Sequence, residues 1–190
     1  VVAYSYDAFP EDAERKRLKA AVDRFEDVTM MTETETASLM RRDGIHVLVD
    51  LKGYTGGSRL SLLKYRAAPI QANWLGYPGT YGLAEADYII ADPFIIPEGS
   101  EAGYSEAVVR LPDSYQPNRR DREVVETPTR AMVGLPETGF VFASFNHVYK
   151  VGSTLFAAWM DILKAVPGSV LWLLSKDPAI GERLRARAEA

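Results

Sequence analysis

Short apolar runs recur along the first half of the chain, each followed by a polar or glycine-rich stretch. Runs rich in β-branched and aromatic residues favour strands. The run HVLVD, at residues 46–50, is apolar enough for a strand buried on both faces. Strands that alternate with helical stretches are typical of a parallel α/β sheet. The predicted strands span residues 1–5, 46–50, 70–74, 87–92 and 107–111.

Helical spacing fills the gap between the first two of these strands. Residues 11–26 place Leu18, Val22 and Phe25 at i, i+4 and i+7, which predicts one helix with a single buried face. Residues 33–43 predict a second helix. This first part of the chain is therefore expected to form most of one α/β domain.

The pattern starts again near residue 140. Residues 112–136 are polar and contain several prolines, which indicates an interdomain linker. After it, FVFASF and SVLWLL predict two strands on either side of an amphipathic helix at residues 153–165. The buried face of that helix is expected to carry Leu155, Trp159, Ile162, Leu163 and Val166. The sequence thus predicts one domain over residues 1–125 and the beginning of another over residues 126–190.

Composition limits the possible chemistry. A net charge of −4 argues against nucleic-acid binding, which usually needs a basic face. Without cysteine, and with only His46 and His147, the chain is poor in the usual zinc ligands, so we expect no metal site. Because His46 lies in an apolar strand, we expect a core histidine bonded to backbone rather than a catalytic base.

The sequence carries no membrane or export signal. None of its apolar runs approaches the roughly 20 residues that span a bilayer, and VVAYSYD lacks the order of a signal peptide. We therefore expect a cytoplasmic protein. The sequence begins without Met and stops within a helical pattern, so we also expect it to be cut from a longer protein.

Two glycine-rich loops follow predicted strands, where open parallel sheets usually bind ligands. In GYTGGSR, glycines would let backbone N–H groups approach a ligand and Thr55 adds a hydroxyl. In LGYPGTYG, a rigid turn would present aromatic and hydroxyl groups, as sugar sites often require. Both loops could equally be structural turns. Asp50, at the end of its strand, could cap or orient the first loop.

A third polar loop, SFNHVYK, follows the first predicted strand of the second domain. It places Asn146, His147, Tyr149 and Lys150 just before a helix. A lysine beside a helix N-terminus suits a diphosphate, because the ammonium group and the free N–H groups both favour anions. The alternative is an ordinary exposed loop lysine.

These motifs together resemble the catalytic region of the O-GlcNAc transferase and SPINDLY family. The resemblance runs in order from about residue 43 to residue 174, through DGIHVLVDLKGYTGGSR, APIQANWLGYPGT, DYIIAD, YSEAVVRLPDSYQP, GLPETGFVFASFNHVYK and WMDILKAVPGSVLWLL. It implies an α/β fold of two Rossmann-like lobes across a cleft, with most of the N-terminal lobe and the start of the C-terminal lobe present here. It also implies inverting, metal-independent transfer of a sugar from a nucleotide diphosphate to protein serine or threonine.

The resemblance also implies roles for individual residues. Lys150 matches the lysine that contacts the donor diphosphate and stabilises the leaving group, and is the implied catalytic residue. Its neighbours in the loop match donor contacts, as do residues in the two glycine-rich loops. The implied donor-binding residues are Gly53, Tyr54, Thr55, Gly79, Thr80, Asn146, His147, Tyr149 and Lys150.

Some features depart from the family pattern. Tyr81 replaces a small hydroxyl residue and is expected to narrow the acceptor side, Ala67 replaces a proline, and His147 replaces an amide. The donor is expected to be UDP-GlcNAc, with GDP-fucose or a catalytically silent scaffold lobe as alternatives. Partners would be protein acceptors, selected by tetratricopeptide repeats in a missing N-terminal part. No cofactor is expected, and these residues alone are expected to be inactive.

Overall fold

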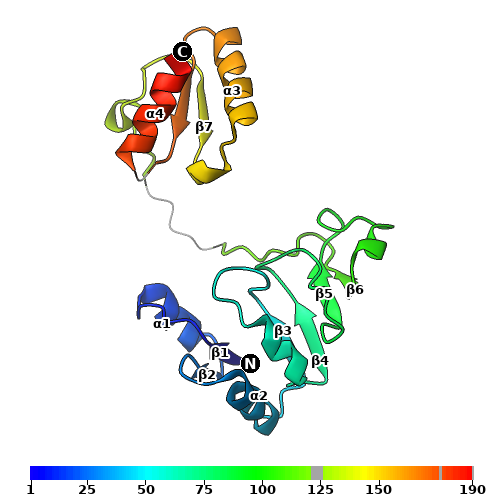
Figure 1. Cartoon of the computed structure of the whole chain (residues 1–190). Helices are drawn as coiled ribbons and strands as arrows, with labels where there is room; N and C mark the ends of the chain where they lie inside the picture. Colours follow the sequence, from blue (N-terminus) through cyan, green and yellow to red (C-terminus); the bar gives the residue numbers. More distant parts are fainter. Residues whose placement is uncertain (121–125, 176, 190) are drawn as a thin grey trace. The chain divides into compact units, whose positions relative to one another are not determined.

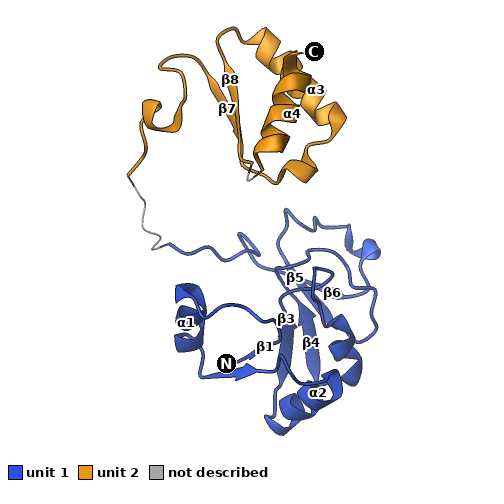
Figure 2. Cartoon of the chain, turned by 60° about the vertical axis from the view of Figure 1, so that its left-hand side comes forward, with its two compact units in different colours: residues 1–121 blue, residues 122–190 orange. Residues whose placement is uncertain are grey.

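The computed structural model describes residues 1–120, 126–175 and 177–189. The chain divides into two compact units, Val1–Asp121 and Arg122–Ala190 (Figure 2). Each unit is an α/β structure whose strands pair in parallel, so the fold class expected from the sequence is confirmed. In the parts of the chain that the structure describes, every helix is too short or too polar to cross a membrane.

Unit 1 contains two parallel sheets (Figure 1). Strands β1 (Val2–Ser5) and β2 (Arg24–Asp27) form the smaller one. The larger one has the order β3-β4-β5-β6. Its strands lie within one or two residues of the predicted ones, at Val47–Asp50, Ile70–Asn73, Tyr88–Ala91 and Ala107–Arg110.

The prediction of one long helix over residues 11–26 is wrong. The structure has a short helix α1, Ala13–Ala20, followed by β2, which pairs Phe25 with Ala3 of β1. Leu18 is 53% exposed, so the apolar spacing that suggested a buried helical face was coincidental. The Phe25 ring instead lies against the charged end of Arg15, 5.1 Å from its guanidinium carbon.

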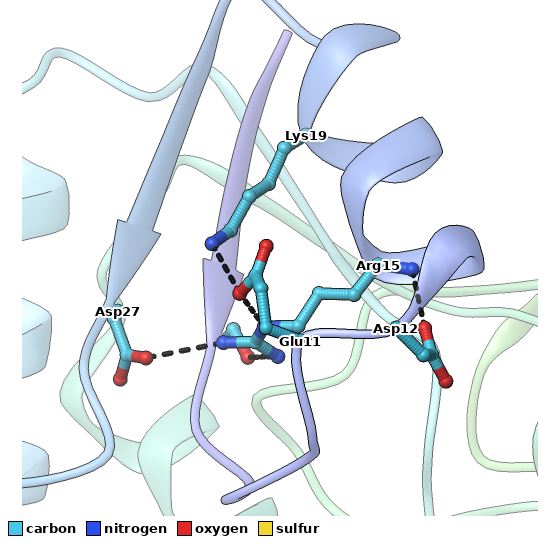
Figure 3. Close-up of polar contacts among 6 residues, drawn as sticks. Glu11, Asp12, Arg15, Lys19 and Asp27 are labelled. Carbon is cyan, nitrogen blue, oxygen red and sulfur yellow. Dashed lines mark hydrogen bonds and ion pairs between the residues drawn. The ribbon is translucent and has the colours of Figure 1, made fainter.

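Polar contacts rather than apolar burial hold α1 in place (Figure 3). Asp12 caps the helix by accepting from the Arg15 N–H group at 2.8 Å. The Arg15 guanidinium reaches Asp27 of β2 at 3.1 Å and also contacts Glu11. Lys19 pairs with Glu11 at 2.7 Å, and this contact lowers the pKa of the Glu11 carboxyl group.

Helix α2, Glu33–Arg42, has the boundaries that the sequence predicts to within a residue. Thr32 and Glu35 form a capping box at its start. Its Ala37 and Met40 pack against the 3₁₀ helix η1, Leu60–Tyr65, which fills the crossover from β3 to β4. This packing attaches α2 to the crossover between β3 and β4.

Strand β3 and His46 are more exposed than the sequence suggests. Val47 is 50% exposed and His46 is exposed, so neither the strand buried on both faces nor the core histidine is found. The reason is topological, because β3 is the edge strand of its sheet in the described chain. His46 precedes the strand, and its carbonyl oxygen accepts from the Ile70 N–H group at 3.3 Å.

The predicted linker is partly anchored to unit 1. Asp92, at the end of β5, accepts from the Tyr115 N–H group at 2.8 Å. The Trp74 indole donates to the Tyr115 carbonyl at the same distance. Residues 121–125 of the linker lie outside the described residues, and Ala131–Val133 form a 3₁₀ turn, η3.

Unit 2 pairs β7, Val141–Ser144, with β8, Val170–Leu173. Helix α3, Ser153–Ala165, joins them with the predicted boundaries, and helix α4, Pro178–Glu189, follows β8. The predicted buried face of α3 is only partly right. Leu155 and Ile162 are 43% and 44% exposed, and Phe156 is the buried residue at 5%. The buried face of α3 is therefore rotated by about one residue from the predicted face, and its centre lies on Phe156, Trp159 and Leu163.

Candidate functional site

The loop after β3 is folded back by its own hydrogen bonds. The Gly53 N–H group donates to Oδ2 of Asp50 at 2.7 Å, which confirms that Asp50 caps the turn. The Thr55 hydroxyl donates to the Lys52 carbonyl at 2.9 Å, and the Tyr54 hydroxyl to the Tyr81 carbonyl at 2.6 Å. Both hydroxyl protons are already donated to carbonyl groups of the protein, so these hydroxyls can only accept hydrogen bonds from a ligand.

The loop after β4 begins with a strained turn. Leu75 has a φ of 72°, and the Gly76 N–H group donates to the Trp74 carbonyl at 3.0 Å, which makes a γ-turn. Gly76 then passes the loop after β3 so closely that a Cβ atom there would lie 2.3 Å from the Leu51 carbonyl oxygen. The two glycine-rich loops therefore meet backbone to backbone at the carboxyl ends of β3 and β4.

Three tyrosines pack between these loops. The rings of Tyr54 and Tyr77 meet edge to face with centroids 5.4 Å apart, and Tyr81 lies 5.9 Å from Tyr54. Gly53, with a φ of 57°, fits among them, since a Cβ atom would lie 2.5 Å from Cβ of Tyr77. Only glycine combines that backbone angle with so little space.

Tyr81 does not narrow the acceptor side as expected. Its ring is 2% exposed and packs on Leu63 and Ala86 in the core. Its hydroxyl donates inward to Oδ2 of Asp50 at 2.6 Å. Burial, followed by the hydrogen bond to Asp50, raises the pKa of Tyr81 well above its ordinary value, so it is no base at neutral pH.

Thr80 has no hydrogen-bonding capacity left for a ligand. Its hydroxyl donates to Glu106 at 2.7 Å and accepts from the N–H groups of Gly82 and Ser105 at 3.1 and 3.2 Å. Glu106 is itself buried and also accepts from the Tyr81 N–H group at 2.6 Å. In this structure Thr80 and Glu106 fasten the β4 loop to the start of β6.

Charged groups gather on the β1 side of the same rim. Lys52 forms an ion pair with Asp7, and both Lys52 and Arg59 lie over the Tyr6 ring, at 5.4 and 5.5 Å from its centroid. Burial, with smaller effects from the carboxylates of Asp50 and Asp7, raises the pKa of Tyr6 to about 12. Tyr6 thus stays protonated near neutral pH and serves as a platform for the two cations.

In unit 2 the loop after β7 is open to solvent. Asn146, His147, Tyr149 and Lys150 are all exposed, and the rings of His147 and Tyr149 stack with centroids 5.5 Å apart. Lys150 lies in the 3₁₀ turn Val148–Lys150, just before α3. Among the described residues, none bonds to or pairs with its ammonium group.

The start of α3 adds to this cationic position. Gly152 is its N-cap, and no side chain caps the first turn. Its free N–H groups carry partial positive charge and favour an anion, as the Lys150 ammonium group does. The local geometry therefore suits a phosphate or diphosphate group.

The structure gathers the predicted site residues in two sets. Gly53, Tyr54, Thr55, Gly79 and Thr80 come together in unit 1, and Asn146, His147, Tyr149 and Lys150 come together in unit 2. Sequence reasoning missed the supporting residues Glu106 and Asn73. Asn73 is buried at the end of β4 and donates to the Gly79 carbonyl at 2.9 Å. For Asn73, the available signal in the sequence was a polar residue inside a predicted strand.

Two further features lie outside these sets. An open hollow of about 520 Å³, lined partly by Arg41, His46 and Arg66, lies at the amino ends of β3 and β4, opposite the loops. Within residues 1–120, 126–175 and 177–189, no three or more His, Cys, Asp or Glu side chains gather as metal ligands would.

Comparison with known proteins finds relatives along the whole chain. The chain is 38% identical over its full length to a probable UDP-N-acetylglucosamine–peptide N-acetylglucosaminyltransferase, SEC, of Arabidopsis thaliana, of which it covers 20%. It is 36% identical over 90% of its length to the SPINDLY protein of Oryza sativa subsp. japonica, which carries the same enzyme name and of which it covers 19%. The chain thus spans about a fifth of the length of these relatives.

A solved structure agrees with these relatives. The chain matches a lysine-to-methionine variant of the O-GlcNAc transferase of Thermobaculum terrenum with a TM-score of 0.84 and 34% identity, over 99% of this chain and 35% of that one. The family model for glycosyl transferase family 41 matches residues 1–121 and 116–189. The resemblance read from the motifs is therefore confirmed, and the chain belongs to glycosyl transferase family 41.

Proposed function

We propose that the protein transfers N-acetylglucosamine from UDP-GlcNAc to serine and threonine hydroxyls of other proteins, with inversion at the sugar and without a metal ion or cofactor. The observation that carries this proposal is the family match through both units, to relatives named for this transfer. Relatives named in this way favour UDP-GlcNAc over GDP-fucose as the donor and an enzyme over a silent scaffold.

Lys150 is the proposed catalytic residue. As the bond between sugar and diphosphate breaks, negative charge grows on the departing diphosphate. The Lys150 ammonium group has no partner among the described residues and lies beside the uncapped N-terminus of α3, so it can stabilise that charge. Asn146, His147 and Tyr149 would contact the nucleotide from the same loop.

The unit 1 loops have a different proposed part. Gly53, Tyr54 and Thr55 would contact the transferred sugar. Tyr54 and Thr55 would do so through hydroxyl lone pairs and an aromatic ring, because their hydroxyl protons are already donated within the protein. Gly79 would shape the wall beside them. Thr80 is saturated by Glu106 and its neighbours, so its part is to hold the loop.

We also propose the setting of the reaction, from the sequence and its resemblance to the family. The acceptors would be cytoplasmic proteins, and tetratricopeptide repeats elsewhere in the full-length protein would select them.

Transfer by the full-length protein tests the proposal. The protein is incubated with protein acceptors and either UDP-GlcNAc or GDP-fucose, with and without EDTA, and the acceptors are weighed by intact mass spectrometry. We expect addition of N-acetylhexosamine that survives EDTA. Addition of a deoxyhexose would change the donor, loss of transfer in EDTA would overturn the metal-independent step, and no addition from either donor would contradict the transferase.

A further inference from the structure

Tyr81 occupies an unusual place between the two glycine-rich loops. It belongs to the loop after β4, yet its hydroxyl reaches the end of β3, where Oδ2 of Asp50 accepts from it at 2.6 Å. The same oxygen accepts from the Gly53 N–H group at 2.7 Å. One carboxylate oxygen therefore joins the side chain of one loop to the backbone of the other.

Two more contacts join Tyr81 to the loop after β3. A Cβ atom at Gly53 would lie 2.8 Å from Cε1 of Tyr81 and 2.9 Å from its hydroxyl oxygen, so the Gly53 backbone rests directly on the ring. The Tyr54 hydroxyl returns to the Tyr81 carbonyl at 2.6 Å. Tyr81 thus contacts this loop through its hydroxyl, its ring and its backbone.

The ring itself is fixed from below. Leu63 and Ala86 bury it in the core, and the Tyr81 N–H group donates to buried Glu106 at 2.6 Å. Because the Tyr81 side chain is fixed in this way, it can in turn fix the loop residues that it contacts. With a short side chain at position 81, Asp50 would lose one of its two hydrogen-bond donors. A cavity would also replace the ring that packs against the Gly53 backbone.

We propose that Tyr81 is a positioning residue that holds Gly53, Tyr54 and Thr55 in the geometry used for sugar transfer. Tyr81 itself would touch no substrate, because its ring is buried and its hydroxyl already donates to Asp50. The proposal rests on the proposed function, since it assigns to these three residues a contact with the transferred sugar.

The test compares Tyr81→Phe with Tyr4→Phe in the full-length protein. Phenylalanine keeps the buried ring, so the first variant removes only the hydroxyl. Tyr4 is the matched control, because its hydroxyl also donates to a carboxylate, that of Asp43 at the end of α2, away from the loops. Two readouts are taken: hydrogen exchange of the amides of residues 53–55, and steady-state transfer kinetics.

In Tyr81→Phe we expect these amides to exchange at least about fivefold faster and kcat for transfer to fall at least about fivefold. This factor is the size of about 1 kcal/mol, a typical hydrogen bond. The KM for UDP-GlcNAc should change less than about twofold, because the donor nucleotide is assigned to unit 2. Tyr4→Phe should leave the loop exchange and kcat unchanged.

Loop exchange equal in both variants would overturn the proposal. Faster exchange with an unchanged kcat would also overturn it, because the loop would then move without consequence for transfer. If the wild-type protein transfers no sugar at all, the proposed function fails, and the exchange rates still decide whether Tyr81 holds the loop.

Discussion

Gly76 leaves no room for a methyl group where the two glycine-rich loops of unit 1 meet. The nearest atoms are the Leu51 carbonyl oxygen and the Lys52 backbone, which cannot rotate away as a side chain could. Leu75 next to it already holds a φ of 72°, which is costly for a residue with a branched side chain. At this scale the site depends on backbone fit, and glycine provides it.

Substitution of Gly76 by alanine should therefore destabilise unit 1. We expect a loss of about 1–3 kcal/mol, the usual cost of forcing extra atoms into a packed region. Gly56→Ala is the matched control from the same pair of loops, because a Cβ atom there meets nothing within 4 Å and should change stability by less than about 0.5 kcal/mol. The opening free energies of β3 and β4 amides, measured by hydrogen exchange, would show the difference, and equal values would contradict the close contact.

At the scale of elements, α3 shows how a surface helix is attached to its unit. Phe156 is its one buried residue in the described structure, and Leu155 beside it faces solvent. Burial of an aromatic side chain contributes far more to stability than a partly exposed leucine. Phe156 is thus the most buried member of the face that attaches the helix, and with it the loop that carries Lys150, to unit 2.

Phe156→Ala should loosen unit 2 by about 3 kcal/mol, because it empties a buried aromatic position. Leu155→Ala removes an apolar side chain from the neighbouring position and should cost less than about 1 kcal/mol. The comparison uses hydrogen exchange of β7 and β8 amides. A larger effect from Leu155→Ala would restore the helix face expected from the sequence and refute the observed one.

Five of the six described strands of unit 1, β1 and β3 to β6, were predictable because each lies in a short, largely apolar run with a turn signal after it. The helix at residues 11–26 was not, since spacing alone cannot distinguish a helical face from a short helix followed by a strand. Phe25 satisfied the helical spacing and yet belongs to β2, where pairing with Ala3 decides its conformation. The exposure of β3 was equally out of reach, because an edge position depends on strand order.

The candidate site was predictable only as far as loops and residue types go. The three loops could be named because they follow strands. Lys150 was singled out by the family resemblance, because its place before a helix alone left an ordinary loop lysine as the alternative. The inward direction of Tyr81 and the saturation of Thr80 by Glu106 could not be foreseen, because they depend on contacts between residues 31 and 26 positions apart. Such contacts leave no local pattern in a sequence.

At the scale of the whole molecule, the two sets of loop residues belong to different units. We propose that the tightly bonded set in unit 1 contacts a transferred sugar and that the exposed, cationic set in unit 2 contacts a diphosphate. The loops of unit 1 would shape the space for the sugar, and the Lys150 ammonium group would neutralise the diphosphate. This division of roles between the two sets depends on Lys150.

The most direct test is calorimetric binding of UDP to the full-length protein and to its Lys150→Ala variant. Lys164→Ala is the matched control, because Lys164 is also an exposed lysine, in the last turn of α3 at the opposite end from Lys150. We expect Lys150→Ala to weaken UDP binding at least about tenfold, or about 1.4 kcal/mol, and Lys164→Ala to leave it unchanged. Equal UDP affinity in the wild-type protein and Lys150→Ala would contradict the assignment of Lys150 to the diphosphate.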